Sequence, residues 1–358
     1  MKEYLYNLAT DKNRGFFPEI AKLFLAVLSL IYALIVRLTV YFKLRNQHVL
    51  GCKVISVGNI TMGGTGKTTL VELIVKYLKS KDKRIAILTR GYKRGVQVKR
   101  QENNDSYESM GDEPYMLQSK FKDLPVIVDK NRVRSALRAI RDFKVDTVVL
   151  DDGFQQWGIK KDLEIVAIDS VQAFGNQKVL PRGILREPLS SLKRADIFVL
   201  TKTDLCLNLE NTLNILGRIN PQALIVESIH EPLGFYELRE PGKLLSVDFL
   251  KGEKVSLFSG IGDPGSFERM VDRLGIDIGQ TFRFNDHHAY SEADLKKIIS
   301  ESKNKGIFNI ITTQKDAVRL LSFNLSDERL RIFVLLIGIK IIKNEERFYS
   351  RLFKLYSA

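Results

Sequence analysis

The stretch that decides the fold is Met62-Gly63-Gly64-Thr65-Gly66-Lys67-Thr68-Thr69, which lies between an apolar run at residues 54–57 and a helical pattern from Leu70 to Leu78. Glycines in such a loop let consecutive backbone N–H groups turn towards an anion at the start of a helix. Lys67 is then placed to reach the β- and γ-phosphates of a nucleotide, and the Thr68 hydroxyl to bind Mg²⁺. The pattern predicts a phosphate loop whose ligand is a nucleoside triphosphate.

The loop departs from the strict pattern at one position. Thr61 stands where the first glycine of G-x-x-x-x-G-K-[ST] is expected, and Gly63 and Gly64 lie inside the loop instead. Glycine-rich turns also arise for conformational reasons alone, but a place between a strand and a helix favours phosphate binding. We therefore expect the nucleotide-binding residues to be Thr61, Met62, Gly63, Gly64, Thr65, Gly66, Lys67, Thr68 and Thr69.

The composition is that of a globular protein with room for two domains, since 44% of the 358 residues are hydrophobic and 27% are charged. The two cysteines, Cys52 and Cys206, exclude a disulfide framework and offer no zinc-type spacing. A net charge of +14 favours an anionic partner, which is nucleic acid, a bilayer or a phosphorylated substrate. Nucleic acid is disfavoured because zinc-finger and RNP-like signatures are absent from the sequence.

An apolar segment near the N-terminus predicts a membrane anchor. Residues 23–36 carry no charge, Lys22 precedes them, and Arg37, Lys43 and Arg45 follow. The uncharged run is shorter than the ~20 residues that a spanning helix needs, so a helix lying in the membrane interface is at least as consistent as a span. A buried core helix is the third possibility, and a cleavable signal peptide is disfavoured because no small-x-small site follows.

After the anchor, short apolar runs alternate with helical patterns at 68–78 and 131–143, which predicts βαβ units in an α/β fold with a doubly wound, mostly parallel sheet. The expected strands of this P-loop core are 54–57, 84–89, 125–128, 147–150, 164–168 and 196–200. The polar stretch 94–105 is expected to lie outside the core.

A similar pattern restarts near residue 205 and predicts a second, smaller α/β lobe. Its expected strands are 223–226, 254–258, 307–312 and 331–337. We therefore divide the chain into an N-terminal membrane-associated segment 1–45, a P-loop core 46–204 and a C-terminal lobe 205–358.

Asp151 and Asp152 follow the expected strand 147–150, where a P-loop protein keeps its Mg²⁺-binding acid. Adjacent residues of a strand point to opposite faces, so the two carboxylates have different tasks unless the chain turns there, which Gly153 allows. A surface turn after the strand is the alternative interpretation.

Three further clusters carry candidate chemistry. Asp112 and Glu113 stand at an expected helix start, His287 and His288 follow an acid, and residues 180–188 place two arginines and a glutamate between prolines. Each alone is equally consistent with a helix cap, ordinary loop residues or solvated charge. An acid near a phosphate loop, however, is what phosphoryl transfer to a hydroxyl uses as a base.

Together and in this order, the clusters resemble the tetraacyldisaccharide 4′-kinase family, the lipid A 4′-kinases of Gram-negative bacteria. The resemblance runs from the anchor to about Leu320. It is carried by the phosphate loop and by residues 56–60, 89–92, 111–114, 151–155, 180–183, 185–188, 286–288 and 313–316.

The resemblance implies transfer of the ATP γ-phosphate, with Mg²⁺, to the 4′-hydroxyl of a tetraacylated glucosamine disaccharide 1-phosphate at the cytoplasmic face of the bacterial inner membrane. The implied partners are this lipid and the membrane surface, with neither nucleic acid nor an obligate protein partner expected. Asp112 is implied as the catalytic base, His287 as its orienting partner and Lys67 as the catalytic phosphate-binding lysine. The implied metal-binding residues are Thr68, Asp151 and Asp152, and the implied substrate contacts are Glu113, Arg132 and Gln155.

One departure from the family is Gln156, where the family usually has His. The alternative hypothesis is a membrane-associated GTPase switch or metallochaperone, favoured by Thr201-Lys202-Thr203-Asp204, which resembles the guanine-reading N-K-x-D motif with Thr in place of Asn. Residues 312–316 are equally consistent with a docking turn and a ligand contact. A non-catalytic scaffold is disfavoured because the loop, the strand-end acids and the candidate base are all present.

Overall fold

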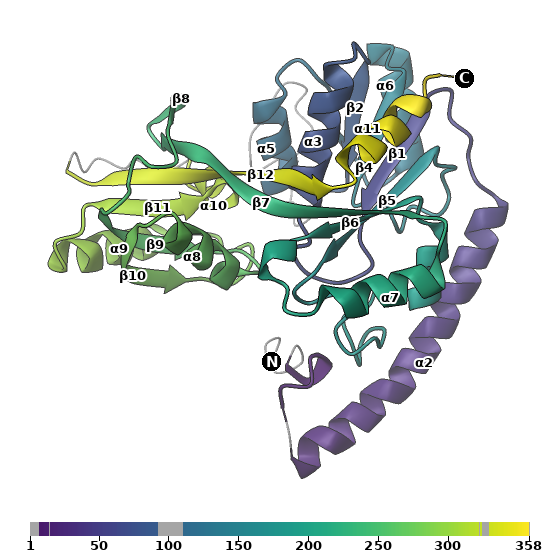
Figure 1. Cartoon of the computed structure of the whole chain (residues 1–358), viewed down its shortest axis with the longest axis horizontal. Coiled ribbons are helices and arrows are strands. Elements are labelled where there is room, and N and C mark those ends of the chain that lie inside the picture. The colour runs from purple at the N-terminus through teal and green to yellow at the C-terminus, as the bar shows by residue number, and fades with distance from the viewer. Residues whose placement is uncertain (1–6, 14, 92–109, 322, 324–328, 358) are drawn as a thin grey trace. The chain divides into compact units, whose positions relative to one another are not determined.

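The computed structural model describes residues 7–13, 15–91, 110–321, 323 and 329–357, which form two compact units. The first unit consists of Met1–Arg90, Asp123–Ile229 and Ile339–Ala358, and the second of Gly91–Lys122 and His230–Gly338. The long strands β7 (Leu224–Glu237) and β12 (Arg331–Lys343) each begin in one unit and end in the other (Figure 1).

The first unit is built on a parallel sheet in the order β3-β2-β4-β1-β5-β6-β7. Apolar side chains bury both faces of such a sheet, which is why its strands follow the continuous apolar runs of the sequence. The strands are β1 (Lys53–Gly58), β2 (Ile85–Thr89), β3 (Val126–Val128), β4 (Thr147–Asp151), β5 (Leu163–Asp169), β6 (Ile197–Thr201) and the first part of β7. The predicted doubly wound α/β core is confirmed.

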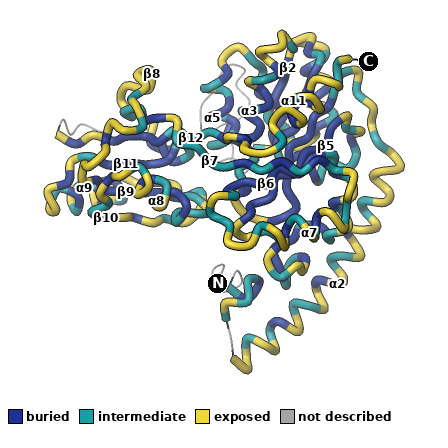
Figure 2. Tube along the Cα trace, in the orientation of Figure 1, coloured by how far each residue is buried: buried dark blue, intermediate teal, exposed yellow. Residues whose placement is uncertain are grey.

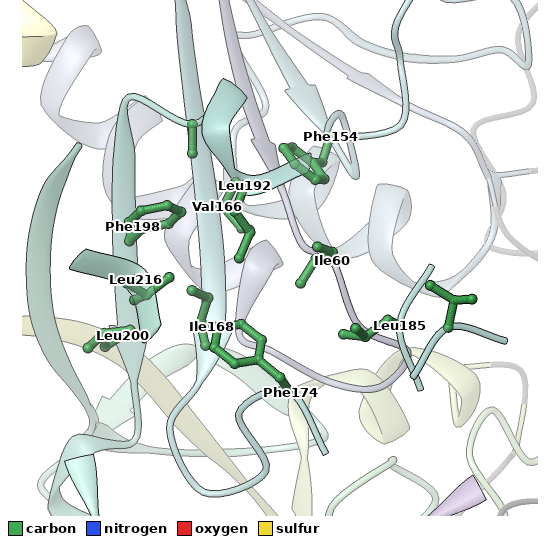
Figure 3. Packing of buried hydrophobic residues seen from close by; sticks show 12 residues of the cluster. Ile60, Phe154, Val166, Ile168, Phe174, Leu185, Leu192, Phe198, Leu200 and Leu216 are labelled. Carbon is green, nitrogen blue, oxygen red and sulfur yellow. The ribbon is translucent and has the colours of Figure 1, made fainter. Parts of the chain in front are cut away.

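Helices cover both faces of this sheet, because alternate residues of a strand point to opposite sides. Leu88 and Leu150 pack with Ala136 of α6 (Arg132–Phe143), whereas α3 (Lys67–Lys79) contacts β1, β2 and β4 and belongs to the opposite face. Figure 3 shows a second part of the core, where Val166 and Phe198 lie with Leu216 of α7 (Leu209–Ile219). The short helices η1 (Leu189–Arg194) and η2 (Thr203–Leu205) also belong to this unit.

The expected anchor is helix α2 (Phe16–Arg45), whose 30 residues have an 18-residue window of mean hydropathy 2.4. Only 11% of that window is buried, and Figure 2 shows the helix exposed along most of its length. The interpretation as a buried core helix is therefore wrong. By length and composition, α2 is a candidate membrane anchor.

The side of α2 that faces protein is narrow and partly polar. Its buried residues are Lys22, Ser29 and Val36, which recur every seven residues and so lie on one side of the helix. The Ser29 hydroxyl donates to the Val179 carbonyl at 2.9 Å, and the Tyr32 hydroxyl donates to the carbonyl of Arg186 at 2.9 Å. The helix is thus attached to the loop between β5 and β6.

The second unit has a smaller sheet in the order β10-β9-β11-β12, in which these strands are parallel. The strands are β9 (Lys254–Ser259), β10 (Asp277–Arg283), β11 (Asn309–Thr313) and the first part of β12, and β8 (Glu240–Leu245) pairs antiparallel with β7. The helices are α5 (Asp112–Lys120), α8 (Pro264–Arg273), α9 (Glu292–Asn304) and α10 (Gln314–Arg319). This confirms the predicted smaller α/β lobe.

The compact units differ from the expected segments 1–45, 46–204 and 205–358. The boundary expected after residue 204 falls inside the first unit, because α7 and the first part of β7 complete its sheet. Residues 339–358 also return to it through α11 (Glu345–Lys354), whose Tyr349 ring lies 4.5 Å from that of Tyr77 on α3. The polar stretch 94–105 lies outside the described residues.

Candidate active site

The predicted phosphate loop lies between β1 and α3, at the carboxyl end of the parallel sheet. Gly63 and Gly66 have φ values of 113° and 76°, a region that favours glycine. Gly66 caps α3 without a side-chain hydrogen bond, so the first N–H groups of the helix remain available to an anion. A Cβ added to Gly63 or Gly64 would meet no atom within 4 Å, which leaves open space over the loop.

Lys67 and Arg186 both approach the carboxylate of Asp152. Lys67 Nζ lies 3.5 Å from Asp152 Oδ1, and Arg186 Nη1 donates to both carboxylate oxygens at 3.0 Å. Burial raises the pKa of Asp152, but the positive charges of Lys67 and Arg186 outweigh it and lower the pKa below the ordinary value. Asp152 is therefore an ionised acid beside the phosphate loop.

Asp151 takes a different place from its neighbour, because the chain turns at Asp152, whose φ is 53°. The buried Asp151 carboxylate accepts a hydrogen bond from the Thr89 hydroxyl at 3.3 Å. The backbone carbonyl of Asp151 accepts one from Arg132 Nη2 at 3.4 Å. The two acids thus have different surroundings although the chain turns here, at Asp152, one residue before Gly153.

Arg132 is a buried cation at the start of α6, only 2% exposed. Its Nη1 donates to the Asp129 carbonyl. Burial lowers its pKa to about 10, against the opposing charges of Asp151 and Asp152. Its Nε has no hydrogen-bond partner among the described residues, which is an arrangement suited to an anionic ligand.

Gln155, expected to contact the substrate, belongs to a network that holds Arg186. Its Oε1 accepts from Arg186 Nη1 at 3.4 Å, and its Nε2 donates to Glu187 Oε1 at 3.0 Å. Glu187 is fully buried and also accepts from Trp157 Nε1 at 3.1 Å and Arg194 Nη2 at 2.9 Å. The cluster at residues 180–188 thus supports the Asp152 site instead of standing in solvent.

In the second unit, Asp112 and His287 form the pair that the sequence analysis expected. Asp112 begins α5 after Gly111, whose φ is 89°. Its Oδ2 lies 3.0 Å from His287 Nδ1 and accepts from Arg319 Nε at 2.7 Å. Burial raises the pKa of Asp112, but the His287 hydrogen bond and the Arg319 charge outweigh it and lower the pKa to about 2.

The neighbouring residues of this pair have other partners. Glu113 forms an ion pair with Lys315 of α10. His288 lies 3.1 Å from Asp294 Oδ2 and stacks on Phe284 with a 4.6 Å centroid separation. Of the two histidines, only His287 contacts the candidate base.

Two arginines of these sites were not among the predicted site residues. Arg186 belongs to the cluster at residues 180–188. The adjacent Glu187 and the two prolines of that cluster were the features of the sequence that could have indicated its role. For Arg319 the sequence signal was weaker. This arginine follows Asp316 by three residues on the short helix α10, which is a spacing that allows an ion pair.

The first strand of the parallel sheet leads through a glycine loop into a helix, and a lysine lies beside a strand-end carboxylate. These features define a P-loop nucleotide-binding protein. The family model described as tetraacyldisaccharide-1-P 4′-kinase, LpxK, matches residues 21–356. The chain belongs to this family, and it is an ATP-dependent kinase that phosphorylates the 4′ position of the lipid A precursor.

Similar proteins agree over nearly the whole chain. A tetraacyldisaccharide 4′-kinase of Halothermothrix orenii is 36% identical over 365 residues, covering 95% of this chain and 94% of that protein. One of Elusimicrobium minutum is 35% identical and covers 84% and 82%. The crystal structure of LpxK from Aquifex aeolicus in complex with ATP has a TM-score of 0.71 at 27% identity, covering 92% of this chain and 97% of that one. The GTPase or metallochaperone hypothesis is not favoured.

Proposed function

We propose that Asp112 accepts the proton of the 4′-hydroxyl while the γ-phosphate of ATP leaves the phosphate loop, and that this occurs at the cytoplasmic face of the inner membrane. The observation that carries the proposal is the 3.0 Å contact between Asp112 Oδ2 and His287 Nδ1. A hydrogen bond from His287 orients the carboxylate, as a general base requires.

The low pKa of Asp112 suits a kinase. A carboxylate with a pKa of about 2 is ionised at every physiological pH and always able to accept a hydrogen bond from the sugar hydroxyl. It is a weak base, but phosphoryl transfer passes through a loose transition state in which the proton need not leave the hydroxyl early. Positioning of the acceptor oxygen is then the larger contribution of Asp112.

The phosphate loop fits a nucleoside triphosphate. The α3 N-terminus is uncapped by side chains, the space over Gly63 and Gly64 is open, and the buried Thr65 hydroxyl has no hydrogen-bond partner among the described residues. Residues 61–69 would hold the phosphates, with Lys67 at the β- and γ-phosphates and Arg132 as a further anion contact. Glu113 and Gln155 remain the proposed substrate contacts.

Mg²⁺, when bound, would neutralise the charge that develops on the phosphates. Thr68, Asp151 and Asp152 are the residues we propose for it. Within the described part of the chain, no group of three or more His, Cys, Asp or Glu residues is arranged to hold a metal. The ion would therefore share its ligands between these side chains and the nucleotide.

The membrane location follows from the substrate and from α2. A tetraacylated lipid resides in a bilayer, so the enzyme must meet it there. Apolar side chains such as Leu30 and Leu34 are 73% and 58% exposed on α2, and Lys43 and Arg45 lie in its last turn. Each such cation contributes about 1 kcal/mol near an anionic leaflet. An orientation towards the cytoplasmic leaflet places ATP on the correct side.

The test is transfer of labelled phosphate from ATP to a defined tetraacyldisaccharide 1-phosphate by the full chain in mixed micelles. Asp112→Asn should lower kcat by about 10²–10⁴-fold, and the product should carry the label at the 4′ position. Near-normal turnover by Asp112→Asn would overturn the assignment of the base. Use of GTP without transfer to the lipid would overturn the kinase mechanism itself.

A further inference from the structure

We propose that Arg319 is a positioning residue for the kinase reaction: fixed by Asp316, it occupies Oδ2 of Asp112 and leaves Oδ1 as the oxygen that receives the substrate hydroxyl. The inference rests on the proposed role of Asp112. It assigns the Thr313-Gln314-Lys315-Asp316 string, which the sequence left between a docking turn and a ligand contact, to the support of the candidate base.

Three donors converge on one oxygen of Asp112. Arg319 Nε donates to Oδ2 at 2.7 Å, Arg319 Nη2 lies 2.5 Å from the same atom, and His287 Nδ1 lies 3.0 Å from it. Within the described part of the chain, the contacts of this carboxylate with other side chains all fall on Oδ2. Because the group is planar and its Oδ2 is held from two residues, the direction of Oδ1 is fixed as well.

Arg319 is itself immobilised. Its side chain is 2% exposed, and its Nη1 donates to Asp316 Oδ1 at 2.9 Å and to the Gly260 carbonyl at 3.0 Å. Asp316 is fully buried and accepts from the Tyr290 hydroxyl at 2.9 Å and from Gly260 N at 3.0 Å. A guanidinium held on both sides in this way cannot follow a moving carboxylate, so it imposes a geometry on Asp112.

Gly260 joins the arginine to the histidine. Its carbonyl accepts from Arg319 Nη1 and also from His287 N at 3.1 Å. A Cβ at this glycine would lie 3.2 Å from Asp316 Oδ1 and 3.2 Å from His288 Cβ. The close approach at Gly260 lets one backbone carbonyl bind both residues that contact Asp112, through Arg319 Nη1 and the backbone N of His287.

The arrangement also controls the charge of the base. The charged or titratable groups facing Asp112 are His287 from the segment before α9, Arg319 from α10 and the adjacent Glu113, which is paired with Lys315. Removing Arg319 leaves burial opposed by His287 alone, so the pKa of Asp112 should rise. As the pH is lowered, the kinase variant would then begin to lose activity at a higher pH than the wild type does.

The experiment compares Arg319→Gln, Arg319→Lys and Asp316→Asn in the full chain, with Arg283→Gln as the matched control. Arg283 is an arginine of the same unit that pairs with Glu268 but has a side chain 63% exposed. The measurements are kcat and KM for ATP and for the lipid, the dependence of kcat on pH, and the thermal midpoint of each variant.

We expect Arg319→Gln to lower kcat by about 10²-fold, to change KM for ATP by less than about threefold because only positioning is lost, and to shift the acid limb of kcat to higher pH. Arg319→Lys should restore part of kcat and of the profile, because it keeps the charge but not the fork. The kcat of Asp316→Asn should lie between those of the two Arg319 variants and that of the wild type. The control should behave as the wild type.

A double variant tests whether Arg319 acts through Asp112. If it does, Asp112→Asn with Arg319→Gln is no slower than Asp112→Asn alone. Additive losses, an unshifted pH profile, or a kcat within about threefold of wild type for Arg319→Gln would overturn the inference. Should Arg319→Gln not fold, Arg319→Lys and Asp316→Asn carry the same pH test. If Asp112→Asn alone retains turnover, the proposed base is wrong, which is a different result from failure of Arg319→Gln alone.

Discussion

Lys67 Nζ lies 3.5 Å from Asp152 Oδ1, an ion pair that joins the start of α3 to the end of β4. In a P-loop protein these two positions serve the phosphates and the metal. The pair holds the lysine side chain beside the strand-end carboxylate, and we propose that its charge is thereby in place before a nucleotide binds. Catalysis gains from a charge that needs no rearrangement.

Lys67→Ala should therefore lower kcat/KM for ATP by about 10²-fold or more, because a preorganised cation at the transferred phosphate is lost. The measurement is labelled phosphate transfer to the lipid at several ATP concentrations. Lys76→Ala, on the exposed side of the same helix, is the control and should leave transfer unchanged. Equal activity of the two variants would exclude the role of Lys67.

The paired histidines should separate by function. His287→Ala removes the orienting contact of Asp112 and should lower kcat by about 10-fold or more. His288→Ala should keep kcat within about threefold and lower the free energy of unfolding by about 1 kcal/mol, since the His288 ring contacts Asp294 and the rings of Phe284 and Tyr290. Steady-state kinetics and urea unfolding measure the two quantities. The opposite pattern would show that the wrong histidine was chosen.

Asp112 should also make folding sensitive to acid. Its pKa is lowered from 3.8 to about 2, so the stability it contributes is fully present above its unfolded pKa and is lost as the pH falls through its folded value. The ionised Asp112 contributes about 2 kcal/mol to the free energy of unfolding at neutral pH. Urea unfolding of wild type and Asp112→Asn at a series of pH values between about 5 and 2.5 should show the wild type losing more stability. Parallel curves would contradict the lowered pKa.

The exposed apolar side of α2 should bind membranes. Leu30→Glu with Leu34→Glu places two charges where lipid is expected and should weaken binding to vesicles containing phosphatidylglycerol by at least about 10-fold. Flotation of the full chain with such vesicles measures the change. Leu207→Glu, at a fully exposed residue that is not part of α2, is the control. Unchanged flotation of the double variant would remove α2 as the anchor.

Much of the first unit was predictable, because strands buried on both faces leave unbroken apolar runs such as those of β1, β4 and β6. Strand β10 was missed for the opposite reason. Its sequence Asp277-Ile278-Gly279-Gln280-Thr281-Phe282-Arg283 has one buried residue, Phe282, because β10 lies at an edge of the sheet. Edge strands lack the continuous pattern on which the prediction relied.

The candidate sites divided in the same way. Lys67 and the strand-end acids were predicted from local strings, because the chemistry of a phosphate loop requires neighbouring residues. Arg319 was not, since it lies 207 residues from Asp112 along the chain and its partner is chosen by the fold. The family resemblance joined Asp112 to His287, and the structure brings these two together as expected, with the arginine beside them as the new element.

The return of residues 339–358 to the first unit has a consequence for biosynthesis. The ring of Tyr349 packs against that of Tyr77, and the Tyr356 hydroxyl lies 2.8 Å from that of Thr147. Helix α11 and the residues after it therefore contact segments of the chain that are translated much earlier. Domains usually fold in the order in which a ribosome delivers them. Here the nucleotide-binding unit receives its last helix, α11, only after translation has passed the entire second unit, so the two ends of its chain must meet across an insertion that is made in between.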